Sequence, residues 1–188
     1  PSSPVADDWR TAWMEASQTI SNAIKDTCLD HVWEGSIANI VVQSLPNKAL
    51  LRLASSMPIR DVDSFATETA VHLVVSSNRG VNGIDGLIAT SLGEAHGHHG
   101  PVAALSGDLS FLHDIGALAT VPRPAVPVVF VIENNQYAMG TSLKRASSSP
   151  ALYTRGAAFG IPGQAVDGMD VLKVREAGLV ATNHCRSG

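Results

Sequence analysis

The chain contains 188 residues, with 13 lysines and arginines against 17 acidic residues, and its net charge is −4. This length suggests one domain, since domains commonly span about 100–200 residues. An acidic chain without a basic block is not expected to bind nucleic acid. The longest apolar run, residues 128–132, is too short to cross a membrane. Two cysteines cannot make a disulfide framework and no secretion leader is evident, so we expect a cytoplasmic protein.

Two helical patterns come first. Between residues 9 and 24, apolar residues recur every three or four positions, which is typical of an amphipathic helix. Trp9 and Trp13 lie on its apolar face, and we expect them in the core or at a subunit contact. A shorter helix is predicted to end at Pro46, because proline interrupts a helix.

From residue 49 onward, predicted strands and helices alternate. The predicted strands cover residues 49–53, 71–75, 102–105 and 126–132, and the predicted helices follow Pro58, include residues 84–95, and span residues 109–120. Strands separated by helices of roughly 10–15 residues indicate parallel β-α-β units. We therefore predict an α/β fold for residues 1–188 as a single domain. Its mostly parallel sheet carries helices on both faces, which makes three layers.

Polar residues follow two neighbouring predicted strands. Asp108, after Gly107, ends one strand, and Asn135 follows the next strand, 27 positions later. One β-α-β crossover needs about 30 residues, so both should emerge side by side at the carboxyl edge of the sheet, where such folds bind ligands. A carboxylate and an amide oxygen suit Mg²⁺, which usually shares its ligands with phosphates. The backbone carbonyl of Tyr137 could add a third protein oxygen.

The same segment favours a diphosphate. Gly107 has no side chain where an anion must approach, and the helix predicted from Leu109 onward directs its amino end to the same place. An alternative is that Gly107 and Asp108 form only a turn with a helix cap, and that the asparagines form a turn. The spacing leaves both interpretations open.

Longer motifs in the first two thirds of the chain point to a known family. They are Ser56–Asp61 (SMPIRD), Ser77–Gly80 (SNRG), Gly83–Gly86 (GIDG) and Gly107–Asp114 (GDLSFLHD). Through them, residues 9–119 resemble the carboxyl-terminal domain of 2-succinyl-5-enolpyruvyl-6-hydroxy-3-cyclohexene-1-carboxylate synthase, a thiamine diphosphate enzyme of menaquinone biosynthesis. One departure is that Ala54 and Ser55 stand where the family usually has Gly-Asn.

This resemblance implies the thiamine diphosphate-binding fold and a set of site residues. The implied cofactor-binding residues are Gly107, Asp108, Leu109, Ser110, Ile84, Asn135 and Tyr137, with Asp108, Asn135 and Tyr137 as the magnesium ligands. Ile84 is implied as the apolar wedge that bends the cofactor, although it could also be a helix core residue. Ser56, Arg60 and Arg79 are implied to bind substrate carboxylates, which suits guanidinium groups.

The last third of the chain resembles a second family. The motifs are Val131–Ser142, Ala157–Gly163, Val166–Val171 and Cys185–Gly188. They are similar to the alpha subunit of the pyruvate dehydrogenase decarboxylase, so residues 128–188 make the chain a mosaic of two families. This resemblance implies the same metal ligands and a possible phosphorylation site at Ser142. The chain departs from it at Leu109, where that family has glycine.

Both families imply a partner. The glutamate that activates the cofactor normally belongs to a separate pyrimidine-binding domain, so no catalytic residue is assigned to this chain. We expect a Mg²⁺–thiamine diphosphate half-site that needs such a domain or a beta-type subunit in a homo- or hetero-oligomer. We expect the substrate to be a small acidic 2-oxo acid. The favoured reaction is the decarboxylation of 2-oxoglutarate and the addition of the resulting succinyl semialdehyde unit to isochorismate. The alternatives are a pyruvate dehydrogenase alpha subunit and a non-catalytic mosaic or fragment that at most binds cofactor.

Overall fold

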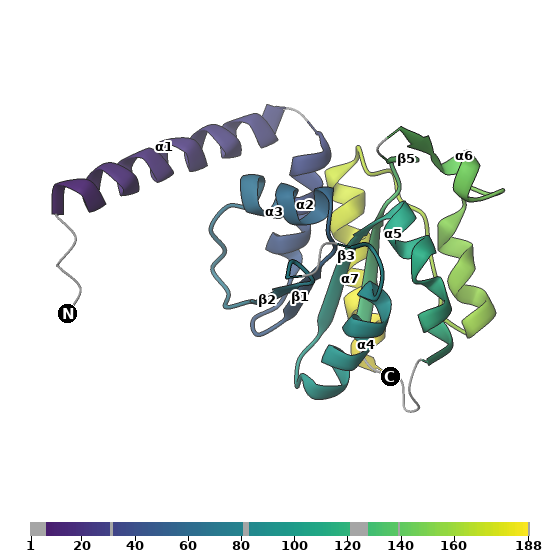
Figure 1. Ribbon diagram of the computed structural model, residues 1–188. Helices are drawn as coiled ribbons and strands as arrows, with labels where there is room; N and C mark the ends of the chain where they lie inside the picture. Colours follow the sequence, from purple (N-terminus) through teal and green to yellow (C-terminus); the bar gives the residue numbers. More distant parts are fainter. Residues whose placement is uncertain (1–6, 31, 81–82, 121–127, 139, 188) are drawn as a thin grey trace.

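The computed structural model describes residues 7–30, 32–80, 83–120, 128–138 and 140–187. Within it, four parallel strands form one sheet in the order β2-β1-β3-β4 (Figure 1). The strands are β1 (Leu50–Leu53), β2 (Val74–Ser77), β3 (Val102–Gly107) and β4 (Val128–Glu133). This arrangement confirms the predicted α/β fold with a parallel sheet.

Helices connect and cover these strands. They are α1 (Asp7–Asp30), α2 (Glu34–Ser44), α3 (Met57–Phe65), α4 (Leu87–Gly97), α5 (Asp108–His113), α6 (Leu143–Ala146) and α7 (Val171–Ser187). Two 3₁₀ helices, η1 (Ile115–Thr120) and η2 (Leu152–Phe159), and a small hairpin of β5 (Tyr137–Ala138) and β6 (Thr141–Ser142) complete the described chain. The sequence patterns predict no helix or strand beyond residue 132, so the hairpin, α6, η2 and α7 are additional elements.

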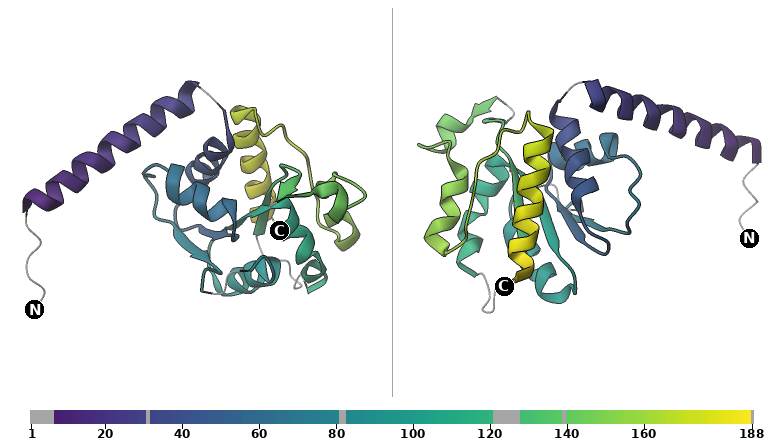
Figure 2. Two further views of the ribbon diagram at one scale, coloured as in Figure 1. Left: turned by 45° about the horizontal axis from the view of Figure 1, so that its top comes forward. Right: turned by 180° about the vertical axis from the view of Figure 1, so that it is seen from behind.

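The sheet separates two apolar layers because successive residues of a strand point to opposite faces. On one face, Leu51 and Leu53 of β1 and Leu105 of β3 pack with α2 and α3, and α7 lies beside α2 (Figure 2). On the other face, Ile88 and Phe111, from α4 and α5, pack with η1 and the alternate side chains of β4. The apolar core therefore covers both faces of the sheet, so polar site residues are expected at the ends of the strands.

The strand order fixes where a ligand is expected. The chain runs from β1 to β2 on one side, then crosses back to β3 and β4 on the other side of β1. The point where the direction reverses, between β1 and β3, is the crevice in which open α/β sheets bind ligands, at the carboxyl ends of the strands. All four strands are parallel, so these ends share one edge.

Three predicted elements require correction. The strand predicted at residues 71–75 is β2, which begins at Val74 because Val74 is the residue paired with Leu50 at the start of β1. Ile84 lies in the loop before α4 and not in a helix, so it is not a helix core residue. The helix predicted over residues 109–120 is two helices, because α5 ends at His113 and η1 starts at Ile115. The start of the strand predicted from residue 126 lies outside the described residues.

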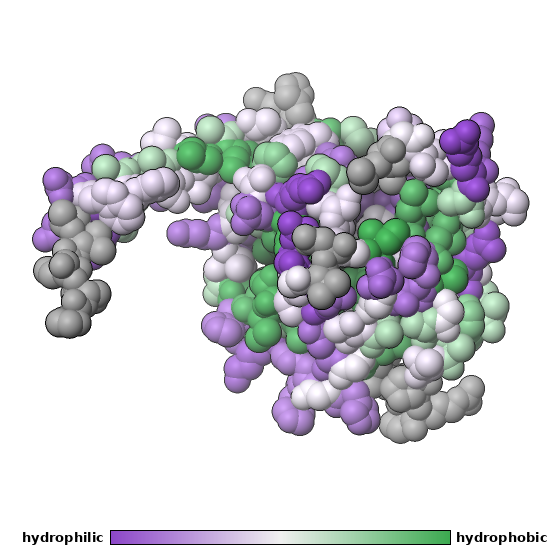
Figure 3. Space-filling model, in the orientation of Figure 1, coloured by the Kyte–Doolittle hydropathy of each residue, from purple (hydrophilic) through white to green (hydrophobic). Residues whose placement is uncertain are grey.

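Helix α1 extends away from the body of the molecule (Figures 1 and 2). Its Trp9 and Trp13 side chains are 57% and 62% exposed, so the expectation that they belong to the core is wrong. Figure 3 shows further apolar residues on the part of α1 nearer the body. Among the described helices, none has the length and apolarity needed to span a membrane.

Candidate functional site

Asp108 sits where β3 passes into α5, and its carboxylate joins two strand ends. Gly107 pairs with Glu133 in the sheet, so β3 and β4 finish side by side. The Asp108 side chain is buried, and its Oδ1 accepts a hydrogen bond from the Leu109 N–H at 2.7 Å. Its Oδ2 accepts from the Gln136 N–H at 2.8 Å. The predicted neighbourhood of residue 108 and the segment after β4 is therefore confirmed.

Asn135 lies one residue from that contact, but its side chain is engaged elsewhere. Its Oδ1 accepts a hydrogen bond from the Tyr137 N–H at 3.1 Å, and its Nδ2 donates to Oε1 of Glu34 at 2.9 Å. Gln136, between them, has a left-handed backbone with φ of 64°, which turns the chain back toward Asp108. The turn thus holds an amide oxygen and the Tyr137 backbone close to a buried carboxylate.

The chemistry of these donors fits a hard divalent cation. An ionised carboxylate has about four acceptor positions, and the recorded hydrogen bonds of Asp108 use two of them. Carboxylate, amide and carbonyl oxygens are the ligand types that Mg²⁺ takes. In the described part of the chain, no group of three His, Cys, Asp or Glu side chains could hold a metal ion. An ion here would therefore need the amide and backbone oxygens of the turn.

Gly107 contributes open space at this edge of the sheet because it has no side chain, and not because its backbone conformation needs glycine. Its φ of −77° is accessible to any residue, so the turn itself does not require glycine. A Cβ placed on Gly107 would meet no atom within 4 Å. Of the neighbouring cofactor candidates, Ser110 is buried in α5, and Leu109 presents its N–H to Asp108.

Three acidic residues near this site were not singled out from the sequence. Burial, followed by the negative charges of Asp61 and Glu34, raises the pKa of Glu133 to about 8. Burial, with Glu34, also raises the pKa of Asp61 above its ordinary value. Glu133 Oε1 and Asp61 Oδ2 are buried without a hydrogen-bond partner among the described residues. These residues lie 27 or more positions apart in the sequence, so no local motif could reveal them.

The predicted substrate residues gather at the other half of the same edge. Ser56 follows β1, Arg60 lies in the first turn of α3, and Arg79 follows β2. All three are exposed, and β1 and β2 are neighbours. Ser56 has a left-handed φ of 79°, which is uncommon for a residue with a side chain. Ser142, the possible phosphorylation site, is half-buried at the end of β6, before α6.

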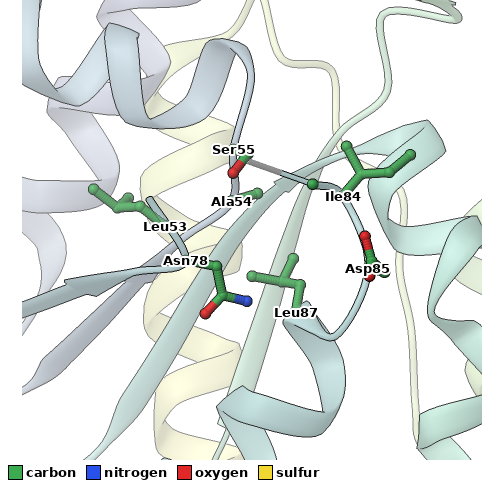
Figure 4. Close-up of a pocket in the computed structure, with 8 residues that line it drawn as sticks. Leu53, Ala54, Ser55, Asn78, Ile84, Asp85 and Leu87 are labelled. Carbon is green, nitrogen blue, oxygen red and sulfur yellow. The ribbon is translucent and has the colours of Figure 1, made fainter. Parts of the chain in front are cut away.

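A small pocket lies where the ends of β1 and β2 face the start of α4 (Figure 4). It is lined by Leu53, Ala54, Ser55, Asn78, Gly83, Ile84, Asp85 and Leu87. Its position after β1 and β2 and before α4 is near the crevice expected from the strand order. Ile84 therefore lines this small pocket from the loop before α4.

Comparisons with known proteins bear on both halves of the chain. The family model "Dehydrogenase E1 component" matches residues 102–188. The 2-succinyl-5-enolpyruvyl-6-hydroxy-3-cyclohexene-1-carboxylate synthase of Haloarcula marismortui is 37% identical over 131 residues, 70% of this chain and 22% of that protein. The synthase of Myxococcus xanthus is 42% identical over 130 residues, 68% of this chain and 22% of that protein.

Solved structures show the same fold. A protein from Mycobacterium smegmatis described as a thiamin diphosphate-dependent enzyme aligns with a TM-score of 0.62 and 20% identity, over 81% of this chain and 29% of that chain. Benzoylformate decarboxylase from Polynucleobacter necessarius aligns with a TM-score of 0.59 and 16% identity, over 81% and 31%. For comparison, the chain spans only 22% of the length of each of the two synthases named above. Both resemblances are confirmed: the chain is a three-layer α/β domain that resembles the synthase and, in its last part, the dehydrogenase E1 component.

Proposed function

We propose that this chain forms the diphosphate-binding half of a Mg²⁺–thiamine diphosphate site in an enzyme that decarboxylates a 2-oxo acid. The observation that carries the proposal is the contact from the Gln136 N–H to Oδ2 of Asp108, at the carboxyl ends of β3 and β4. It unites a buried carboxylate with a turn that offers amide and carbonyl oxygens. The likeness to the synthases supports the choice of cofactor.

Each residue of the site has a distinct part in this proposal. Asp108, Asn135 and the Tyr137 carbonyl would hold the ion, and the open side of Gly107 would leave room for the diphosphate. Ile84, in its pocket, would press against the cofactor. When bound, thiamine diphosphate supplies the carbanion chemistry that amino-acid side chains lack.

The substrate is proposed to be a small acidic 2-oxo acid. Arg60 and Arg79 are exposed at the same edge as the pocket, so their guanidinium groups are free to reach a carboxylate from solvent. Of the two related activities, we favour the synthase reaction on 2-oxoglutarate and isochorismate, because the synthases match this chain over 130 residues or more. The E1 component match over residues 102–188 keeps pyruvate dehydrogenase as the second candidate.

A partner is proposed to supply the pyrimidine-binding half. The chain exposes 11460 Å², whereas a compact monomer of 19.6 kDa would expose about 8,600 Å². Helix α1 accounts for part of this excess, because Trp9, Trp13, Met14 and Ile20 are each at least 57% exposed. Such a face suits contact with a second copy of the chain or with a beta-type subunit, in a homo- or hetero-oligomer.

Calorimetric titration with thiamine diphosphate, with and without Mg²⁺, tests the proposal. We expect binding that requires the ion in the wild-type chain. Carbon dioxide release from 2-oxoglutarate or pyruvate should appear only after a pyrimidine-binding partner is added. Equal cofactor binding with and without Mg²⁺, or turnover by the chain alone, would contradict the proposal.

A further inference from the structure

Helix α4 begins without a cap of its own. Gly86, the residue before it, has no side chain, and its left-handed φ of 73° turns the loop of residues 83–86 into the helix. The first N–H groups of a helix have no partner within that helix, so they need an acceptor from elsewhere. The acceptor for α4 therefore has to come from another part of the chain.

Asp114 supplies that acceptor, although it lies 26 positions beyond Ile88 in the sequence. Its Oδ2 accepts hydrogen bonds from the Ile88 N–H at 2.6 Å and from the Ala89 N–H at 3.1 Å. Asp114 is itself held in place, because it follows α5 directly and its carbonyl accepts from the Ala117 N–H at 2.9 Å. Ile88 is fully buried and packs with Phe111 of α5. The start of α4 and the end of α5 therefore form one packed unit.

The two ends of α5 carry two parts of the proposed site. Asp108, at its start, receives the turn after β4. Asp114, just past its end, receives the start of α4 and with it the loop that carries Ile84 (Figure 4). The six residues of α5 span about 9 Å at 1.5 Å per residue. This helix therefore sets the distance between the residue expected to hold the ion and the anchor of the loop.

The loop is also fixed to α4 from within. The Gly86 carbonyl accepts hydrogen bonds from the Thr90 N–H at 2.9 Å and from the Thr90 hydroxyl at 2.6 Å. These bonds join the loop to α4, and the bonds of Asp114 join α4 to α5. Ile84 is half-buried and lies two residues before Gly86. A shift of the first turn of α4 would therefore move Ile84 as well.

We propose that Asp114 is a positioning residue for the cofactor site: by capping α4 from the end of α5, it holds the loop of residues 83–86, and with it Ile84, at a fixed position relative to Asp108. The inference rests on the proposed function for the cofactor, whereas the anchoring of the loop is independent of it. Without this cap, the loop would occupy several positions. The apparent affinity for a ligand falls with the fraction of molecules in the position that binds it.

Asp114→Ala and Asp114→Asn test the anchor in the chain without cofactor. Both hydrogen bonds go to one carboxylate oxygen, so the amide oxygen of asparagine can replace it, and asparagine caps helices about as well as aspartate. In Asp114→Ala, we expect the methyl NMR signals of Ile84 to shift and hydrogen exchange of the Ile88 and Ala89 amides to quicken. Asp114→Asn should keep the wild-type signals. Wild-type signals in Asp114→Ala, or alanine-like signals in Asp114→Asn, would overturn the inference.

Cofactor affinity separates positioning from stability. Asp170 provides the matched control, because its Oδ1 accepts from the Lys173 N–H at 3.1 Å and so caps α7, on the opposite face of the sheet from α4. With Mg²⁺ present, we expect the affinity for thiamine diphosphate to fall about 5-fold or more in Asp114→Ala, because losing a cap shifts the equilibrium of the first turn by about that factor. Asp114→Asn and Asp170→Ala should keep the wild-type affinity. Equal losses in Asp114→Ala and Asp170→Ala would overturn the inference.

A second variant covers the case in which Asp114→Ala does not fold. Asp114→Glu keeps the charge but moves the acceptor by one carbon–carbon bond, so the Ile84 and Ile88 signals should again depart from wild type. Wild-type signals in Asp114→Glu would overturn the inference. If the wild-type chain binds no cofactor, the proposed function fails, and the NMR signals still decide whether Asp114 anchors the loop.

Discussion

The Gln136 N–H donates to Oδ2 of Asp108 at 2.8 Å, and this hydrogen bond ties the turn after β4 to the end of β3. It makes Asp108 both a structural acceptor and the residue expected to hold the ion. Replacing Asp108 with alanine should therefore abolish the Mg²⁺-dependent part of thiamine diphosphate binding in a calorimetric titration. The free energy of unfolding should also fall by about 1–3 kcal/mol, because two N–H groups lose their acceptor. Asp8→Ala, on exposed α1, is the matched control, and retained Mg²⁺-dependent binding in Asp108→Ala would refute the metal assignment.

Gly107→Ala separates space for a ligand from the needs of the fold. The backbone of Gly107 does not require glycine, and a Cβ there meets no atom within 4 Å. We expect the free energy of unfolding to stay the same or rise by up to about 1 kcal/mol, because alanine restricts the unfolded chain. Cofactor affinity should fall, since the methyl group occupies the diphosphate's space. Gly178→Ala on α7, which also has open space, should leave affinity unchanged. Full affinity in Gly107→Ala would show that the diphosphate does not approach there.

Glu133 predicts a pH dependence of stability. Burial, then Asp61 and Glu34, raise its pKa from 4.5 to about 8 in the folded chain. The folded state then holds a proton that the unfolded state loses, so the contribution of Glu133 is fully present below about pH 4.5 and is lost as the pH rises through 8. Urea denaturation across this range should show wild-type stability falling relative to Glu133→Gln, by at most about 1.4 kcal/mol per pH unit. Parallel curves for the two proteins would show that Glu133 is ionised when folded.

The two exposed tryptophans predict an association surface. Trp9 and Trp13 contact each other on α1, with ring centroids 5.8 Å apart. Trp9→Ser/Trp13→Ser should leave the midpoint of the unfolding transition unchanged, because neither tryptophan side chain is buried in the core around the sheet. In sedimentation velocity, the double variant should shift the population toward smaller species. Gln18→Ala/Asn22→Ala, also on α1, provides the control. Equal sedimentation of wild type and the tryptophan variant would exclude this face as the self-association surface.

The elements that the sequence predicted best are strands made of a continuous apolar run. Strands β3 and β4 are continuous apolar runs, and their polar ends placed Asp108 and Asn135 at one edge. The predicted strand at residues 71–75 begins three residues before β2. Apolar residues precede β2 in the sequence, and only its pairing with β1 sets where it begins. Helix α7 was not predicted. Several of its apolar residues, such as Leu172, which is 73% exposed, face solvent, so the apolar positions in its sequence do not follow a clear helical repeat.

The polar networks could not be predicted, because they depend on tertiary contact. Arg52 and Glu94 are 42 positions apart and meet only when α4 packs on the sheet. In sequence, Arg52 interrupts an otherwise apolar strand and gives no sign of its partner. Likewise, the Asn135 side chain was expected to face the ion, whereas its amide nitrogen contacts Glu34, 101 positions away. The residues predicted to bind the cofactor belong to local motifs, whereas the contacts of Arg52 and Asn135 depend on packing between distant parts of the chain.

The most direct test of the central claim uses Mn²⁺ in place of Mg²⁺ as a paramagnetic probe. With thiamine diphosphate present, the account predicts that substoichiometric Mn²⁺ broadens the backbone amide NMR signals of residues 107–110 and 135–137 before any others. Broadening centred on another part of the chain, or none with the cofactor at saturation, would contradict the account.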